Sequence, residues 1–252
     1  MVKNMEKKKY DSIYIKSYYN EYGEGIGYDN KQLWMNNFNN IADNIIKIIN
    51  PKTVLDIGCA YGYLVEALRK KGVEAYGIDV SEYAINQSEE SIRPYLKCMS
   101  ALDGLPENFP KQYDLVVSIE MIEHLYEEDG LKLIAKISEY SNQVLLSSTD
   151  SDFDDPTHFN VQPKEYWVEK FAHHSYLRNL QSDVTFISPN TYFFQKQNNL
   201  DIYKVINHYE KSIPIKKYNH TGIKSKVSKL LNTKLLFLKP VVKKMAKILN
   251  IK

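Results

Sequence analysis

The sequence contains little cysteine and no long run of apolar residues. Only two cysteines occur among the 252 residues, Cys59 and Cys98, and they form no CxxC pair. A disulfide framework or a thiolate metal site is therefore excluded, and reduced thiols in a cytoplasm are expected. The longest late apolar run, Leu235 to Leu238, is far shorter than the roughly 18 residues that a membrane span needs. The first ten residues contain no signal-peptide core, so we expect a cytoplasmic protein.

Acidic residues are missing from the C-terminal end of the chain. Residues 211–252 contain twelve lysines and no aspartate or glutamate. Removing these lysines from the 33 basic residues leaves 21 against 31 acidic residues, a net charge of −10 for residues 1–210. An acidic body therefore carries a basic tail. Because such a body repels a phosphate backbone, nucleic acid is not expected as a partner.

Apolar residues in the tail follow a helical stripe between lysines. The stripe comprises Val227, Leu230, Leu231, Leu235 and Leu238, and it resumes after Pro240 at Val241, Val242, Met245, Ile248 and Leu249. This pattern is typical of an amphipathic helix that lies on an anionic membrane surface. We therefore expect peripheral contact with the inner membrane face. Docking on the acidic body, or disorder, are the alternatives.

The middle of the chain alternates between short apolar segments and helix-like segments. The expected strands are residues 53–58, 74–79, 95–100, 113–119 and 143–149. Before them, apolar residues from Leu33 to Ile49 have helical spacing, and Pro51 ends that helix. After them, residues 163–180 predict a helix, and residues 184–188 and 191–197 predict a closing pair of strands. This alternation predicts right-handed crossovers and a parallel sheet.

The first strand runs into a glycine turn and a second helix, in the segment VLDIGCAYGYLVEAL at residues 54–68. Gly58 and Gly62 would allow a polar ligand to approach exposed backbone amides closely. A dinucleotide-binding fingerprint would need three glycines in GxGxxG, whereas this segment has GCAYG preceded by Asp56. The turn therefore indicates a different nucleotide-like cofactor.

The segment DIGCAYG resembles the first motif of class I methyltransferases, and GIDVSEYAI resembles their second. The resemblance implies an α/β fold that is Rossmann-like and doubly wound, with a mostly parallel seven-stranded sheet and helices on both faces. It also implies S-adenosylmethionine as cofactor and three regions: an N-terminal lid and helix at 1–50, a methyltransferase core at 51–210 and the basic amphipathic tail at 211–252.

The same resemblance assigns the cofactor contacts. Asp56, Gly58 and Gly62 would surround the methionine end, and Asp79, followed by Val80, would accept both ribose hydroxyls. The positions that align best with the adenine contact of the third motif are Ser100 and Ala101. An alternative is that Asp56 only caps a turn and Asp79 only caps the helix that begins at Ser81.

Glu120, Glu123 and His124 follow the fourth expected strand with the i, i+3, i+4 spacing of one helical face. His158, in the loop after the fifth strand, would return to the same sheet edge. This set resembles the metal-dependent O-methyltransferases with an ExxEH motif, of which the small-RNA 2′-O-methyltransferases and the ubiquinone-pathway enzymes are branches. The resemblance implies Mg, Mn or Fe held by Glu120, Glu123, His124 and His158. Local packing without a metal is the alternative.

The catalytic residues expected from this resemblance are Glu120 and His158, and His158 would serve either as a ligand or as a general base. The early tyrosines, among them Tyr18, Tyr19, Tyr22 and Tyr28, would form a lid or belong to the core. Four aspartates crowd the approach to His158: Asp150, Asp152, Asp154 and Asp155. They would bind a hydroxyl-rich substrate or a second cation, or merely form turns. His173 and His174 are expected to pack or to face solvent.

The acceptor that we expect is the hydroxyl of a small molecule, a nucleotide sugar or a glycan, in surface-glycan synthesis of the capsule type. The loop DPTHFNVQPKEYW is similar to that of bacterial sugar methyltransferases. A catechol-like hydroxyl in quinone synthesis and a terminal RNA ribose are the enzymatic alternatives. A protein that binds the cofactor or a partner without transferring methyl is the alternative outside enzymes.

Overall fold

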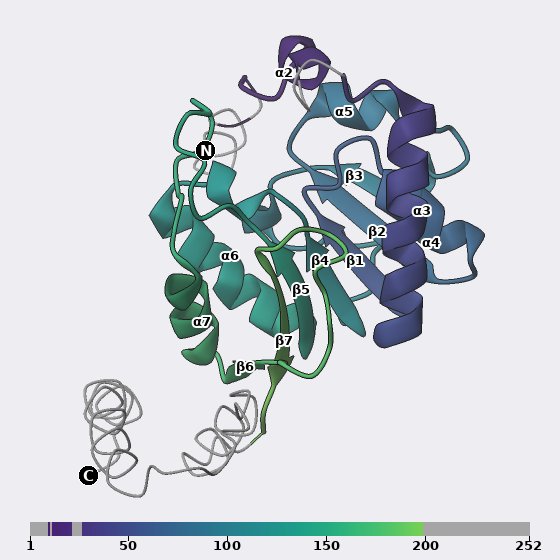
Figure 1. Ribbon diagram of the computed structural model, residues 1–252. Coiled ribbons are helices and arrows are strands. Elements are labelled where there is room, and N and C mark those ends of the chain that lie inside the picture. The colour runs from purple at the N-terminus through teal and green to yellow at the C-terminus, as the bar shows by residue number, and fades with distance from the viewer. Residues whose placement is uncertain (1–9, 11, 22–26, 199–252) are drawn as a thin grey trace, which may run out of the picture. The chain divides into compact units, whose positions relative to one another are not determined.

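The computed structural model describes residues 10, 12–21 and 27–198 (Figure 1). This part of the chain forms one sheet of seven strands in the order β3-β2-β1-β4-β5-β7-β6. The strands are β1 (Thr53–Ile57), β2 (Glu74–Asp79), β3 (Leu96–Cys98), β4 (Leu115–Ser118), β5 (Gln143–Ser147), β6 (Tyr176–Arg178) and β7 (Thr191–Lys196). The first five pair in parallel, and β7 runs antiparallel to β5 and β6. The predicted mostly parallel, seven-stranded fold is confirmed.

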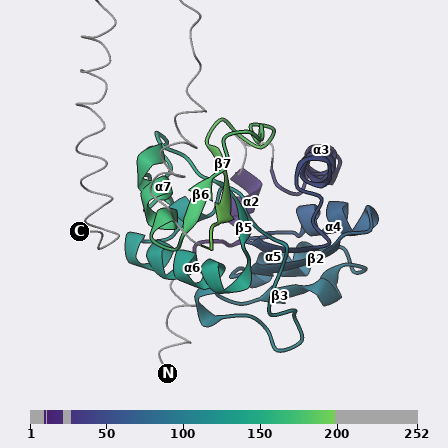
Figure 2. The same cartoon turned by 90° about the horizontal axis from the view of Figure 1, so that it is seen from below.

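Helices cover both faces of this sheet, as Figures 1 and 2 show. They are α2 (Lys16–Glu21), α3 (Lys31–Ile48), α4 (Tyr63–Lys70), α5 (Glu82–Gln87), α6 (Glu127–Tyr140) and α7 (Lys164–Ala172). Short 3₁₀ turns are η1 (Arg93–Tyr95), η2 (Ala101–Asp103) and η3 (Ile122–His124). None of the helices in the described ranges has the length and apolar content needed to cross a membrane.

Alternate residues of the central strands feed two separate cores. Leu115 and Val117 of β4 pack with α3, α4 and α5, whereas Val116 between them packs with α6 and α7. Leu115, Val116 and Val117 are all fully buried. Side chains of a strand point alternately to opposite faces, so a strand buried on both faces is apolar without interruption. This explains the continuous apolar run of the fourth predicted strand.

Helix α3 confirms the helix predicted before Pro51. The side chain of Asn30 accepts from the backbone N–H of Leu33 and caps its first turn. The apolar face at Met35, Phe38, Ile41, Ala42 and Ile45 is buried. The helix ends at Ile48, and Asn50, with a φ of 52°, turns the chain into Pro51 and β1.

Two expectations for the last part of the core are wrong. The helix predicted at 163–180 stops at Ala172, because Ser175 takes a φ of 67° and the chain reverses into β6. Residues 184–188 form turns in place of a strand, since the Asp183 carboxylate accepts from both the N–H and the hydroxyl of Thr185. The partner of β7 is therefore β6. The tail at 211–252 and Tyr22 lie outside the described residues.

Candidate active site

The turn after β1 requires glycine at two places, for two different reasons. Gly58 has a φ of 81°, and a Cβ there would lie 2.3 Å from Cγ of Met121. Gly62 has a φ of 74°, and a Cβ there would lie 2.7 Å from Cδ1 of Leu96. Gly58 borders the cavity described next, whereas Gly62 lies outside its lining. The predicted approach of Gly62 to the cofactor stays a prediction, and the structure shows in addition that Leu96 of β3 leaves no room for a side chain there.

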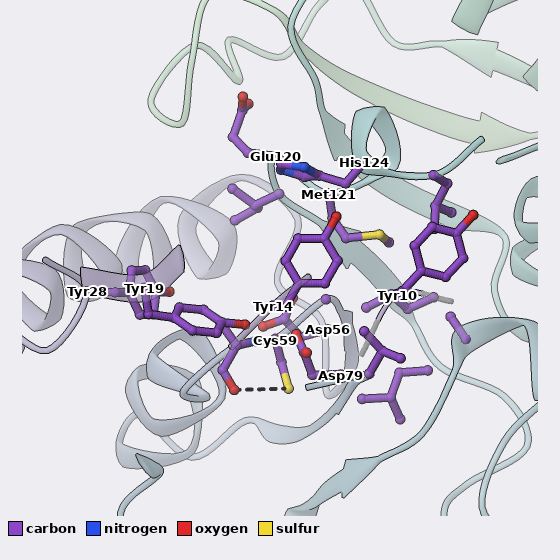
Figure 3. A pocket seen from close by; sticks show the side chains of 18 of the residues that line it. Tyr10, Tyr14, Tyr19, Tyr28, Asp56, Cys59, Asp79, Glu120, Met121 and His124 are labelled. Carbon is purple, nitrogen blue, oxygen red and sulfur yellow. Dashed lines mark hydrogen bonds between the residues drawn. The ribbon is translucent and has the colours of Figure 1, made fainter. Parts of the chain in front are cut away.

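A cavity opens at the carboxyl ends of the parallel strands, the usual ligand position in such folds. It is lined by six of the seven residues predicted to contact the cofactor, namely Asp56, Gly58, Asp79, Val80, Ser100 and Ala101. Figure 3 shows the carboxylates of Asp56 and Asp79 at one end, with Glu120 and His124 at the other. The fold therefore brings six of the seven predicted residues to one cavity, and their contact with a cofactor stays a prediction.

Asp79 is held by the backbone on both sides. Its Oδ1 accepts from the N–H of Ser81 and its Oδ2 from the N–H of Ala60, each at 2.8 Å. Helix α5 is capped by the Ser81 hydroxyl, which accepts from the N–H of Ala84 at 3.1 Å. The alternative role of Asp79 as a helix cap therefore falls mainly to Ser81. A carboxylate oxygen can accept more than one hydrogen bond, as contact with ribose hydroxyls would require.

Asp56 lies deeper in the cavity than Asp79. Its side chain is buried, and burial raises the pKa of its carboxyl to about 8, with the nearby charge of Asp79 as the second cause. A cationic group such as an amine or a sulfonium would be stabilised beside two such carboxyls. This end of the cavity therefore suits the positively charged half of a cofactor.

Tyrosines from the N-terminal segment close the cavity. Its lining includes Tyr10, Tyr14, Tyr18, Tyr19 and Tyr28. The Tyr10 hydroxyl donates to Asp129 at 2.7 Å, and the Ser81 hydroxyl donates to the backbone oxygen of Tyr14 at 2.5 Å. These bonds attach the segment to α6 and α5. The expected tyrosines Tyr18, Tyr19 and Tyr28 thus line the cavity, and Tyr19 and Tyr28 also belong to the buried core, so the role of a lid stays a prediction. Tyr10 and Tyr14 precede Tyr18 at i, i+4 spacing, which was the sequence signal for these two further members.

Three side chains meet beside the far end of this cavity. Glu123, His124 and His158 each offer one ligand atom, and these atoms lie within 4.8 Å of one another. Glu123 is fully buried, and neither of its carboxylate oxygens has a hydrogen-bond partner among the described residues. Burial raises the pKa of Glu123, and the charge of Glu120 adds to that rise. A buried carboxylate without a donor is costly unless a cation or a proton satisfies it.

Both histidines of this group are oriented by backbone carbonyls. Nδ1 of His124 lies 3.1 Å from the oxygen of Thr157, and Nδ1 of His158 lies 3.0 Å from the oxygen of Asp152. Because a carbonyl oxygen only accepts, each Nδ1 carries the proton and each Nε2 keeps its lone pair. In metal-binding histidines, too, the nitrogen that does not bind the metal usually donates to a carbonyl or carboxylate oxygen, which orients the ring. Burial, with His158 as the next cause, lowers the pKa of His124 to about 4.

Glu120 is not part of this group. It was expected on one helical face with Glu123 and His124, but η3 begins only at Ile122, and Glu120 takes a φ of 45° just before it. Its carboxylate lines the cavity and accepts from the Ser188 hydroxyl at 3.5 Å. Glu120 therefore lies outside the group of three, although it stays close enough for its charge to raise the pKa of Glu123.

Most of the neighbouring aspartates and the remaining histidines have local roles. Asp155 accepts from the N–H and the hydroxyl of Thr157, and Asp150 accepts from Asn190. His173 is exposed beside Glu169, as expected for a surface residue. These contacts support the interpretation of the acidic loop as a set of turns.

A carboxylate and two imidazole nitrogens form a mixed ligand set that suits Mg²⁺, Mn²⁺ or Fe²⁺. The oriented histidines and the unpaired Glu123 oxygens therefore fit the predicted divalent cation, with three protein ligands in place of four.

Comparison with known proteins agrees with this geometry. Residues 29–183 match the family model described as a methyltransferase domain. The ubiquinone biosynthesis O-methyltransferase of Pseudomonas paraeruginosa is 31% identical over 121 residues, 46% of this chain and 47% of the relative. That of Nitrosomonas europaea is 33% identical over 90 residues, 34% of this chain and 38% of the relative. The chain thus spans less than half the length of these relatives.

Solved structures share the fold at low sequence identity. Magnesium protoporphyrin IX methyltransferase from Synechocystis PCC 6803, with bound S-adenosylhomocysteine, aligns with a TM-score of 0.55 at 14% identity, covering 77% of this chain and 100% of that one. The O-methyltransferase from a polyketide synthase of Brevibacillus brevis, in complex with S-adenosylhomocysteine, aligns with a TM-score of 0.54 at 14% identity, covering 73% and 80%. Both likenesses concern the fold alone.

Proposed function

This chain belongs to the methyltransferase domain family, and from that membership we infer that it transfers the methyl group of S-adenosylmethionine to a hydroxyl oxygen. The cofactor would lie in the cavity at the ends of β1 and β2. There Asp79 would accept from the ribose hydroxyls, and the buried Asp56 would face the cationic methionine end. The names of the partial relatives, O-methyltransferases of ubiquinone biosynthesis, support oxygen as the accepting atom.

We further propose that Glu123, His124 and His158 hold a divalent cation at the acceptor end of the cavity. The observation that carries this proposal is the fully buried Glu123 carboxylate, which has no hydrogen-bond partner in the described part of the chain and lies beside two imidazoles with oriented Nε2 atoms. When bound, such a cation lowers the pKa of a hydroxyl and neutralises the charge that remains after proton loss.

Side chains of this protein would remove the acceptor proton and align the reactants. Glu120 lines the cavity outside the clustered ligands, so its carboxylate is placed to take the acceptor proton. The lid tyrosines would exclude water and orient the two reactants, and alignment of this kind contributes several kcal/mol to catalysis. His158 is assigned to the cation, and its alternative role as a general base is a matter for the test below.

The acceptor that we propose carries two neighbouring oxygens, because a diol can approach a cation through both. The sugar hydroxyl expected from the sequence remains one such acceptor, and the catechol-like hydroxyl remains the other. The relatives' names favour the catechol-like class. Turnover would be compared for two pairs of acceptors, one aromatic and one of sugars. In each pair, one compound carries the second hydroxyl and the other lacks it, so the results would separate the two classes.

Removal of the cation tests the proposed function. Enzyme treated with a chelator is expected to lose most of its turnover while its affinity for S-adenosylmethionine changes little, and added Mg²⁺ or Mn²⁺ should restore turnover. Glu123→Gln and His158→Ala should each have the effect of chelation. Asp154→Asn is the matched control, since Asp154 is exposed in the same loop and outside the group.

Full turnover in metal-stripped enzyme would reject the cation. In that case, loss of turnover on His158→Ala would assign His158 to the general base. No acceptor-dependent formation of S-adenosylhomocysteine from any diol would reject methyl transfer itself and favour the binding-only alternative.

A further inference from the structure

Tyr18 connects the N-terminal lid to the group of candidate ligands. Its hydroxyl lies 3.4 Å from Nε2 of His124, and its ring meets the imidazole edge-on at 6.0 Å between centroids. Tyr18 also packs edge-on against Tyr14 and Tyr19. These rings all belong to the segment that closes the cavity. The lid thus reaches the same imidazole that is proposed to bind the cation.

The other ring nitrogen of His124 determines which group donates in this contact. Nδ1 of His124 gives its proton to the oxygen of Thr157, so Nε2 has only a lone pair to offer. The Tyr18 hydroxyl must therefore donate to Nε2. The same lone pair is the only one through which His124, in this orientation, can bind a cation. One lone pair cannot serve both partners.

We propose that Tyr18 is a positioning residue that occupies the His124 Nε2 lone pair and competes there with a divalent cation, so that binding of the cation releases the lid. This inference rests on the proposed cation site. It adds a coupling between that site and the described lid residues 12–21. These residues are also attached by the bond from the Ser81 hydroxyl to the backbone oxygen of Tyr14 and by the bond from the N–H of Tyr28 to the oxygen of Tyr19. Because such coupling is reciprocal, an open lid favours the cation as much as the cation favours an open lid.

Tyr14 supplies a matched control. Its ring also meets His124 edge-on, at 5.6 Å between centroids, and Figure 3 shows it beside that imidazole. Its hydroxyl is buried and has no hydrogen-bond partner within the described ranges. Removal of either hydroxyl leaves an aromatic ring against His124, but only the loss of the Tyr18 hydroxyl removes a donor to Nε2.

The experiment is a titration of the metal-free, full-length protein with Mn²⁺, followed by electron paramagnetic resonance. Tyr18→Phe is expected to bind Mn²⁺ about two- to ten-fold more tightly than the wild type, the factor that corresponds to one neutral hydrogen bond. Tyr14→Phe is expected to bind as the wild type does. Circular dichroism melting curves would check that both variants fold.

A second measurement follows the lid directly. Lys16 is exposed on α2, so trypsin cleavage after it reports lid opening. Mn²⁺ should accelerate this cleavage in the wild type, whereas in Tyr18→Phe the cleavage should be fast with or without Mn²⁺.

The outcomes separate the two proposals. If the wild type binds Mn²⁺ and Tyr18→Phe binds it no more tightly, or if Mn²⁺ slows cleavage after Lys16, the competition is rejected and the cation site stands. If neither the wild type nor Tyr18→Phe binds Mn²⁺, the cation site is rejected, and the competition with it.

Discussion

Asp56 and Asp79 face the same cavity but differ in their surroundings. Two backbone N–H groups donate to Asp79, whereas no donor within the described residues reaches Asp56, and burial raises the pKa of Asp56 to about 8. The ordinary pKa of an aspartate in an unfolded chain is about 4. Between about pH 4 and pH 8 the folded protein therefore holds a proton on Asp56 that the unfolded chain releases.

This difference predicts how stability depends on pH. Because the folded state binds the extra proton, the contribution of Asp56 to stability falls as the pH rises from about 4 to about 8, and the loss is complete above that. Asp56→Asn removes the titration. In the cofactor-free protein the melting temperature of Asp56→Asn, relative to that of the wild type, should rise from pH 5 to pH 8.5. A difference between the two proteins that does not vary over this range would contradict the raised pKa.

At the scale of elements, hydrophobic pattern predicted most of the fold. Strands β1, β2, β3, β4, β5 and β7 lie within the predicted segments. Central strands buried on both faces are recognisable because they are largely apolar. The end of α7 was missed because no glycine marks it: Ser175, a residue that rarely adopts positive φ, makes the turn. The three-residue strand β6 is too short for any periodicity to reveal.

The spacing of sequence motifs predicted part of the candidate site. Six of the residues predicted to contact the cofactor lie near the ends of β1, β2 and β3 and line one cavity, and His158 lies beside Glu123 and His124 as expected. Spacing alone could not separate Glu120 from its neighbours, since that depends on a backbone of positive φ ahead of a single 3₁₀ turn. The Tyr18 contact joins residues 106 positions apart, which only the tertiary fold brings together.

Gly62 permits a test of packing at the start of α4. Gly62→Ala would press against Leu96 and Ile92, at 2.7 and 2.9 Å, and would place alanine at a φ of 74°. Gly72 is the matched control, because its φ is 83° and no atom lies within 4 Å of a Cβ there. Backbone strain is thus common to both variants. Gly62→Ala should lower the free energy of unfolding by about 1–3 kcal/mol more than Gly72→Ala does.

Urea denaturation of the two variants would measure this difference. Because Gly62 lies outside the cavity lining, calorimetry should find nearly wild-type affinity for S-adenosylmethionine in Gly62→Ala at a temperature where it is folded. Equal losses of stability in the two variants would show that the side chains of Leu96 and Ile92 move aside without lowering the free energy of unfolding, which would contradict the prediction.

At the scale of the whole chain, the charges are distributed unevenly between residues 1–210 and residues 211–252. Residues 1–210 carry a net charge of −10, and the residues proposed for catalysis all lie within them. Residues 211–252 carry twelve lysines without an acid. The sequence pattern of that segment, a lysine-flanked apolar stripe, predicts binding to an anionic bilayer, which the acidic body would oppose on its own.

Vesicles of anionic and of neutral lipid would test the tail in the full chain. Each lysine near an anionic surface contributes about 1 kcal/mol, so replacement of six tail lysines by glutamine should reduce binding to anionic vesicles by several orders of magnitude. Binding should also weaken as salt is added, because screening acts on the same charges. Turnover on a water-soluble acceptor should stay close to that of the wild type, since no catalytic residue proposed above lies in the tail. Equal binding of the two proteins to anionic vesicles would reject the membrane role and leave docking on the acidic body, or disorder, as the alternatives.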